Sequence, residues 1–213
     1  TEPGTPRVDQ PKNRTLIVKP TFVFDITDNF ELTLLGSYFR ADGGGSATRA
    51  FIPPETGRLL RAQTEFGYFP PDDPYEINHD LVGRNFTEAK TAILEANWNL
   101  GHGLVTGIAG WRDIQYDNSL DVDGTPFTLL HFPDNEEGGD QLSFELRYAS
   151  TFSDKWNFTV GLFHFEQDFS ILEKRQITGR AANRAHTAFL YQLGDATQEQ
   201  DSQAVFGNVN FNI

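Results

Sequence analysis

In the stretch Gln141-Leu142-Ser143-Phe144-Glu145-Leu146-Arg147-Tyr148, apolar and polar side chains alternate without a break. Successive side chains of a β-strand point to opposite faces of its sheet. The four apolar side chains of this stretch therefore share one face, and the four polar ones share the other. The alternation predicts a strand with one apolar and one polar face.

The same period of two recurs along the chain. It predicts seven strands, at about 14–25, 30–40, 88–100, 104–116, 141–151, 156–167 and 203–213. Two of the seven are irregular, because Pro20 interrupts the first, while Trp111 and Arg112 lie on the unexpected faces of the fourth. No segment has a convincing helical period, so the sequence predicts an all-β, antiparallel fold.

Short and long connections alternate between these strands. The connections at 26–29, 101–103 and 152–155 are tight turns, whereas those at 41–87, 117–140 and 168–202 are long and rich in Gly, Pro, Asp and Asn. In an up-and-down meander this alternation puts all tight turns at one end and all long loops at the other. Outer-membrane barrels are built in this way, with short periplasmic turns and long external loops.

Aromatic residues gather near both ends of the predicted strands. Girdles of aromatic residues mark the two interfaces of transmembrane barrels. We expect an inner girdle close to the tight turns, formed by Phe24, Phe30, Trp98, Phe152 and Trp156. We expect an outer girdle at the opposite strand ends, formed by Tyr38, Phe39, Tyr116, Phe165 and Phe169. A soluble β-sandwich or lipocalin-like barrel also alternates its faces, and it is the structural alternative.

Composition narrows the classes of function. The formal net charge of -13 argues against a nucleic-acid partner, since phosphate binding calls for a basic surface. The chain has no Cys, and no run approaches the ~20 apolar residues that a spanning helix needs. Transmembrane strands remain possible, because they need only ~9 to 11 residues with alternate apolar side chains.

Five segments resemble the barrel strands of TonB-dependent outer-membrane receptors. They begin with Ala96-Asn97-Trp98-Asn99-Leu100-Gly101 and continue with Ile108-Ala109-Gly110-Trp111-Arg112, Asp140-Gln141-Leu142-Ser143-Phe144-Glu145-Leu146-Arg147, Phe158-Thr159-Val160-Gly161-Leu162-Phe163-His164-Phe165 and Ala204-Val205-Phe206-Gly207. The resemblance implies a 22-stranded barrel with a plug domain, which imports a scarce nutrient with energy from the TonB complex. The default nutrient of this family is a ferric siderophore or a similar chelate.

Seven strands are fewer than such a barrel requires, and the sequence shows neither a plug nor a TonB box. We therefore expect residues 1–213 to be one partial barrel domain, an internal segment of a larger protein in the bacterial outer membrane. The expected partners are membrane lipid, lipopolysaccharide, the nutrient and, through a plug domain, the TonB complex. A passive porin-like barrel and a soluble β-rich binding module are the alternatives.

Residues that could carry chemistry are few, and no enzymatic function or cofactor is predicted. Alternating carboxylates in Asp121-Val122-Asp123-Gly124 resemble the start of a calcium loop, but no Glu follows at the required spacing. We interpret this segment as a solvated acidic turn. His79, His131 and His186 lie in predicted long loops and show no ligand spacing, so they are interpreted as surface residues.

The predicted long loops also carry candidate ligand-binding residues. The first mixes Phe51, Phe66 and Phe69 with Tyr and Arg residues, and the third contains Lys174 and Arg184 among further Arg residues. Aromatic rings supply apolar surface, and guanidinium groups grip carboxylates and other oxyanions. The candidates for an anionic chelate are Arg58, Arg61, Tyr68, Tyr75, Arg175 and Arg180. Packing between loops and contact with lipopolysaccharide are alternative roles.

Overall fold

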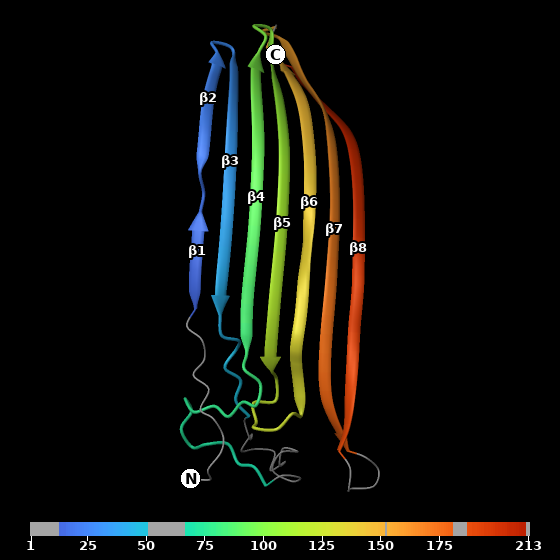
Figure 1. Cartoon of the computed structure of the whole chain (residues 1–213). Helices are drawn as coiled ribbons and strands as arrows, with labels where there is room; N and C mark the ends of the chain where they lie inside the picture. The colour runs from blue at the N-terminus through green and yellow to red at the C-terminus, as the bar shows by residue number, and fades with distance from the viewer. Residues whose placement is uncertain (1–12, 51–66, 152, 181–186, 212–213) are drawn as a thin grey trace.

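The computed structural model is a single β-sheet (Figure 1). It describes residues 13–50, 67–151, 153–180 and 187–211, without the side chains of 178–189. The strands are β1 (Arg14–Val18), β2 (Thr21–Thr27), β3 (Phe30–Gly43), β4 (Arg84–Asn99), β5 (Gly103–Asp121), β6 (Leu130–Ser150), β7 (Trp156–Arg180) and β8 (Thr187–Phe211). Across these ranges no helix is long and apolar enough to cross a membrane.

The sheet is an antiparallel up-and-down meander, as the alternation of turns predicted. Each strand from β3 to β8 pairs with its neighbour in sequence, and β1 and β2 both pair with β3. The break between β1 and β2 falls at Pro20, which has no backbone N–H to give to a ladder. Its carbonyl still accepts a hydrogen bond of 3.0 Å from the Gly36 N–H, so β1 and β2 follow one line along β3.

Hydrogen-bond register confirms the two-faced strands. Leu34 pairs with Leu94, Leu94 with Ala109, and Ala109 with Phe144, so an apolar row crosses four strands on one face. On β5 this face carries Val105, Gly107, Ala109 and Trp111. Trp111 pairs with Ala92 and with Leu142, which both lie on the apolar face. The prediction that Trp111 lies on the unexpected face is therefore wrong. Arg112 correspondingly lies on the polar face.

The strands extend far beyond the predicted ones. Two of the three predicted long loops, 117–140 and 168–202, are largely strand: β5 and β6 are joined by 122–129, and β7 continues to Arg180. Only the connection 44–83 is long, as expected. The sequence pattern did not predict these strand segments, because they are rich in polar residues and show no clear alternation of apolar and polar side chains.

The five residues of the predicted outer girdle do not share one face of the sheet. Tyr38 lies on the apolar face, in the row of Val18 and Lys90. Phe39, Tyr116, Phe165 and Phe169 lie on the opposite face. The inner girdle fits the register better, since Phe30 pairs with Trp98 and Trp156 pairs with Phe211 near the tight turns. Phe152 lies outside the described residues.

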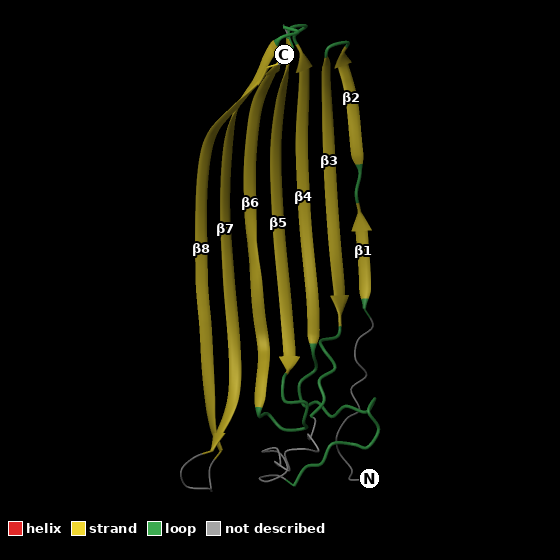
Figure 2. Ribbon diagram, turned by 180° about the vertical axis from the view of Figure 1, so that it is seen from behind, coloured by secondary structure: helices red, strands yellow, loops and turns green. Residues whose placement is uncertain are grey.

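The sheet is one layer with two open edges (Figure 2). In the part of the chain that the structure describes, β1, β2 and β8 pair on one side only, and Ala50 and Phe86 are the only buried apolar side chains. Soluble domains bury their apolar faces between packed layers. This sheet has no second layer, so the ladder of backbone hydrogen bonds holds the strands together.

Gly161 tests the packing between β7 and β8. It pairs with Phe206, and a Cβ added at Gly161 would overlap the Phe206 ring. We expect Gly161→Ala to displace that ring and lower the free energy of unfolding by about 1 to 2 kcal/mol, the usual range for overpacking. Equilibrium urea denaturation measures the change. Gly207→Ala, where the nearest contact is an ordinary 3.4 Å, is the matched control and should change stability by less than ~0.5 kcal/mol. Equal effects of the two substitutions would contradict this packing.

Candidate functional site

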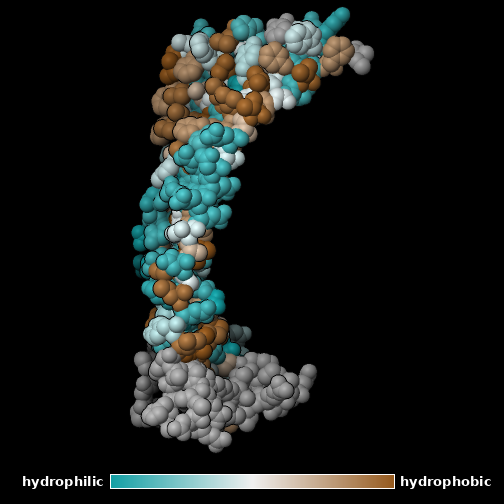
Figure 3. Space-filling view, turned by 90° about the vertical axis from the view of Figure 1, so that its right-hand side faces the viewer, coloured by the Kyte–Doolittle hydropathy of each residue, from teal (hydrophilic) through white to brown (hydrophobic). Residues whose placement is uncertain are grey.

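The most extensive surface feature is an apolar band on one face of the sheet, on the half nearest the tight turns (Figure 3). It is composed of large apolar side chains that the register places on the same face, all of them exposed except the half-buried Leu32, Val105 and Leu142. The apolar band comprises Leu16, Val18, Phe22, Phe24, Leu32, Leu34, Leu94, Trp98, Val105, Trp111, Leu142, Phe144, Leu146, Val160, Leu162, Val205 and Val209.

Some of these apolar side chains are more exposed than polar side chains on the opposite face. Leu146 and Leu162 are 53% and 54% exposed, whereas the Glu145 side chain on the other face is 28% exposed and Thr106 only 2%. A protein in water is expected to show the reverse, since burial of apolar area stabilises the fold. Contiguous exposed apolar patches mark surfaces that contact another apolar phase or partner.

On β4, β5 and β6, charged side chains bound the apolar band on the side away from the tight turns. One row of the same face contains Lys90, Asp113, Asp140, Asp168 and Glu199. On β6 this face carries no charged side chain from Leu142 to the buried Ser150, about nine residues or roughly 30 Å along the strand at 3.3 Å per residue. Barrel strands are tilted by about 35 to 45°, so this length corresponds to a height of roughly 23 Å, close to the ~25 Å apolar band of transmembrane barrels.

The band crosses the sheet obliquely. On β1 it reaches Leu16, whose row runs through the register to Thr197 on β8. On β8 the band instead ends at Val205, nearer the tight turns. The boundary thus shifts by about eight residues, roughly 27 Å, across six strand spacings of ~4.8 Å, roughly 29 Å. A band parallel to a membrane would then require strands tilted by roughly 40°, and barrel strands are tilted by about 35 to 45°.

The opposite face is mixed at the same height: it carries apolar side chains such as Ile93, Ile108 and Phe163 together with polar side chains that bond to one another. The Thr106 hydroxyl donates to the Asn97 side chain (2.8 Å), and Asn97 donates to Glu95 (2.8 Å). Arg147 pairs with Glu145 at 3.5 Å. These residues make this face suited to water rather than to lipid.

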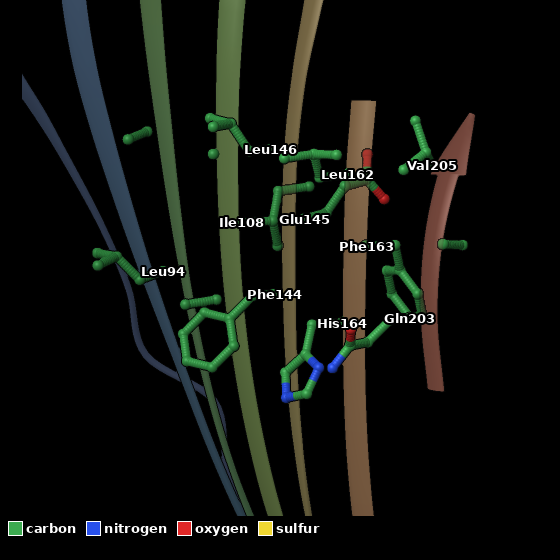
Figure 4. Close-up of a pocket in the computed structure, with 14 residues that line it drawn as sticks. Leu94, Ile108, Phe144, Glu145, Leu146, Leu162, Phe163, His164, Gln203 and Val205 are labelled. Atoms are coloured by element: carbon green, nitrogen blue, oxygen red, sulfur yellow. The ribbon is translucent and has the colours of Figure 1, made fainter. Parts of the chain in front are cut away.

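An open hollow lies on the apolar band between β4 and β8 (Figure 4). It has a volume of about 740 Å³, and its lining includes Leu94, Phe144, Leu146, Leu162 and Val205. His164 and Gln203 edge it on the side of the charged row. The lining chemistry suits an acyl chain rather than a polar ligand.

The predicted ligand-binding residues of the first loop are only partly visible. Arg58 and Arg61 lie outside the described residues. Tyr68 packs edge-on against Phe127, with ring centroids 6.0 Å apart, and its hydroxyl accepts a hydrogen bond from Asn78 (3.3 Å). Tyr75 is 93% exposed. Tyr68 therefore helps to hold the loop, while Tyr75 is open to a ligand.

Arg175 and Arg180 are not loop residues, as had been expected, because both belong to β7. The Arg175 guanidinium pairs with Glu173 at 2.5 Å and lies over the Phe132 ring, 5.2 Å from its centroid. Neighbouring Lys174 pairs with Asp134. Arg180 pairs with Thr187 through the backbone. The charges of Arg175 and Lys174 are thus neutralised within the sheet, which weakens their assignment to an anionic ligand.

Asp121, Asp123 and Gly124 do not form the solvated turn expected from the sequence. Asp121 is 1% exposed, and its Oδ1 accepts the Gly124 N–H (2.9 Å). The two oxygens of Asp123 accept backbone N–H groups of Thr125, Leu129 and Leu130. The turn is buried because the long loop covers it: the Ala50 N–H donates to the Gly124 carbonyl (3.3 Å). Asp123 is fully engaged, so the calcium-loop alternative is not supported either.

His131 is likewise buried, although the sequence suggested a surface position. It is 4% exposed and pairs directly across the ladder with Asp121. Its Nε2 lies 2.7 Å from Asp80 Oδ1, 3.7 Å from Asp121 Oδ2 and 3.8 Å from Asp123 Oδ2. Sequence spacing could not reveal this grouping, since Asp80 comes from the long loop. We call Asp80, Asp121 and His131 the loop-end cluster.

Burial and charge act against each other in the loop-end cluster. Burial tends to lower the pKa of His131, but the Asp80 carboxylate, aided by Asp121 and Asp123, outweighs it and raises that pKa. Burial tends to raise the pKa of Asp80, yet its contacts with His131 and Thr128 lower it overall. The pKa of Asp121 is raised, chiefly by burial and further by the Asp123 charge. Asp121 is therefore the carboxylate least compensated by its surroundings.

Gly124 fits the long loop against the sheet. Its φ is +64°, and an added Cβ would lie 2.6 Å from the Ala50 backbone nitrogen. We expect Gly124→Ala to loosen the segment 44–50, which contacts Gly124, seen as faster limited proteolysis there. Gly67→Ala is the matched control, since Gly67 has a φ of +67° but nothing within 4 Å of an added Cβ. Gly67→Ala therefore costs only the free energy of placing a non-glycine residue in the left-handed backbone region, about 1 to 2 kcal/mol. Identical proteolysis rates in the two variants would contradict the contact.

Neither a protein-family model nor a curated protein matches this sequence.

Proposed function

We propose that this sheet is part of the wall of a transmembrane β-barrel in the bacterial outer membrane, and that the barrel is a TonB-dependent receptor. It would take up a scarce nutrient, with a ferric siderophore or a similar chelate as the leading ligand class. The observation that carries the proposal is the oblique apolar band, with its bilayer-like height and its charged boundary.

Two properties of the sheet favour lipid over water on the apolar band. The first is the absence of an apolar core among the described side chains, Ala50 and Phe86 apart. A soluble β-rich module would cover Leu146 and Leu162 with a second layer. The second is the slant of the band, because a tilt near 40° is a geometric requirement of closed barrels and not of open soluble sheets.

The shape of the sheet favours a wide barrel over a small one. Its strands lie side by side in one broad layer, and the front and back views agree (Figures 1 and 2). β7 and β8 have 25 residues each, roughly 80 Å at 3.3 Å per residue, while the hydrocarbon core is ~30 Å thick. Much of each strand would project beyond the bilayer on the side of the long loop, as expected of a receptor that captures ligand outside.

Partners follow from this placement. Membrane lipid would cover the apolar band, and lipopolysaccharide would surround the strands on the side of the long loop. The TonB complex would act through a plug domain, which the family resemblance implies. The opposite face, with Glu95, Glu145 and Arg147, would line the lumen.

Leu146→Arg tests the membrane placement. In a bilayer an Arg at the middle of the band should cost about 2 to 4 kcal/mol of folding free energy. In water the same change at a half-exposed position should cost less than ~0.5 kcal/mol. The measurement is urea-induced unfolding from lipid vesicles. Gln115→Arg is the matched control, because Gln115 lies on the same face beyond the charged row and should be neutral. A neutral Leu146→Arg would refute the membrane placement.

Tyr75→Ala tests the receptor function. Cells that express the protein should accumulate radiolabelled iron from at least one of a set of hydroxamate, catecholate and carboxylate siderophores, and an uncoupler should abolish the uptake. Loss of the Tyr75 ring should weaken ligand binding about tenfold, equivalent to ~1.4 kcal/mol. Stability should stay unchanged because the ring is exposed. Uptake that resists the uncoupler would instead indicate a passive porin.

A further inference from the structure

We propose that Asp80, Asp121 and His131 bind a divalent transition-metal ion of the zinc class, which fastens the 67–83 loop to the β5–β6 end of the sheet. The site goes beyond the proposed receptor function and does not depend on it, because the three residues lie at the long-loop end, away from the apolar band. The metal is here a structural clamp rather than the transported nutrient.

The ligand atoms already converge. One carboxylate oxygen each from Asp80 and Asp121 and one ring nitrogen of His131 lie within 4.8 Å of one another. Two ligands bound to Zn²⁺ at about 2.0 to 2.2 Å can be at most ~4.4 Å apart. Small rotations of the side chains would therefore bring all three into coordination distance.

A buried atom without a partner points into the cluster. The Asp121 side chain is 0% exposed, and its Oδ2 makes no hydrogen bond although it lies 3.7 Å from His131 Nε2. Leaving a buried carboxylate oxygen unsatisfied is costly. The Nε2 of His131 also makes no hydrogen bond, because its 2.7 Å contact with Asp80 does not have hydrogen-bond geometry. A metal ion would satisfy both atoms at once.

Charge also favours a cation. Asp80, Asp121 and Asp123 bring three carboxylates around the single imidazole of His131. Even with that imidazole protonated, the group carries excess negative charge, with Asp121 and His131 buried and Asp80 reaching the cluster from the surface. Asp123 does not compete for the metal, because both of its oxygens hold backbone N–H groups. It stabilises the turn that positions Asp121.

The donor set selects the class of metal. Ca²⁺ and Mg²⁺ prefer sites made of oxygen ligands, whereas an imidazole together with carboxylates suits Zn²⁺ and its neighbours in the first transition series. Surrounding contacts orient the donors, as metal sites require. Thr128 donates to Asp80 Oδ2 (2.7 Å), and the Gly124 N–H holds Asp121 Oδ1 (2.9 Å).

The experiment titrates the purified protein, kept in detergent, with ZnCl₂ by calorimetry and with Co²⁺ by visible absorption. We expect one Zn²⁺ per chain, no comparable binding of Ca²⁺ or Mg²⁺, and the intense bands of four-coordinate Co²⁺. Asp121→Asn and His131→Asn should each weaken Zn²⁺ binding by at least about 100-fold, more than the loss of an orienting group costs. Bound Zn²⁺ should also slow proteolysis of the 67–83 loop.

His164→Gln is the matched control. His164, Glu166 and Asp201 form a second group with ligand spacing, but Glu166 is 56% exposed and the group is open to water. The control should leave the tight site intact. Zn²⁺ binding that is lost only in His164→Gln would overturn the proposal, as would binding unchanged by Asp121→Asn and His131→Asn. Absence of four-coordinate Co²⁺ bands in the unaltered protein would overturn it regardless of how the variants fold.

Discussion

The backbone ladder is the interaction on which the rest of this structure depends. With one layer and almost no buried apolar side chains, the sheet is held by strand pairing from β1 to β8. Isolated sheets of this kind expose apolar surface and unpaired edges, and both favour association. The apolar band therefore needs an apolar surrounding, and the proposed bilayer supplies one. The same surrounding explains why Leu146 is more exposed than Glu145, because lipid contact replaces core packing.

Within the proposed bilayer, the two faces of a strand would meet different surroundings. The apolar face meets lipid along about nine residues, and the polar face satisfies its own groups through contacts such as Thr106 to Asn97. The charged row of Asp113 and Asp140 ends the apolar face where water returns. Beyond that row the strands continue on hydrogen bonds and cross-strand pairs, with Phe39, Ile114 and Phe169 in one row of the opposite face.

This change of environment explains how much could be predicted from sequence. Segments such as 141–151 were predicted well, because an apolar and a polar face impose a period of two. β7 beyond Gln167 was missed, because the long stretch 168–202 is rich in polar residues that are typical of loops. The pairing of Phe30 with Trp98 near a tight turn agrees with the expected inner girdle, whereas Phe165 and Phe169 were expected at a strand end and lie within β7. The loop-end cluster was beyond prediction, since Asp80 and His131 meet only after the long loop folds back.

In the strand halves between the charged row and the long loop, the face pattern is weak, and contacts at the loop end can fix the register. When both faces of a strand are polar, a slip by one residue exposes nothing new, so the face pattern specifies register only weakly. Cross-strand contacts fix it instead, as between Lys174 and Asp134. β5 and β6 also carry bulges, after Asn118 and after His131, which interrupt any regular slide. The loop-end cluster lies at these bulges, where Asp121 opposes His131. A bound metal ion there would lock the far end of the β5–β6 hairpin, as the tight turns lock the near ends of its neighbours.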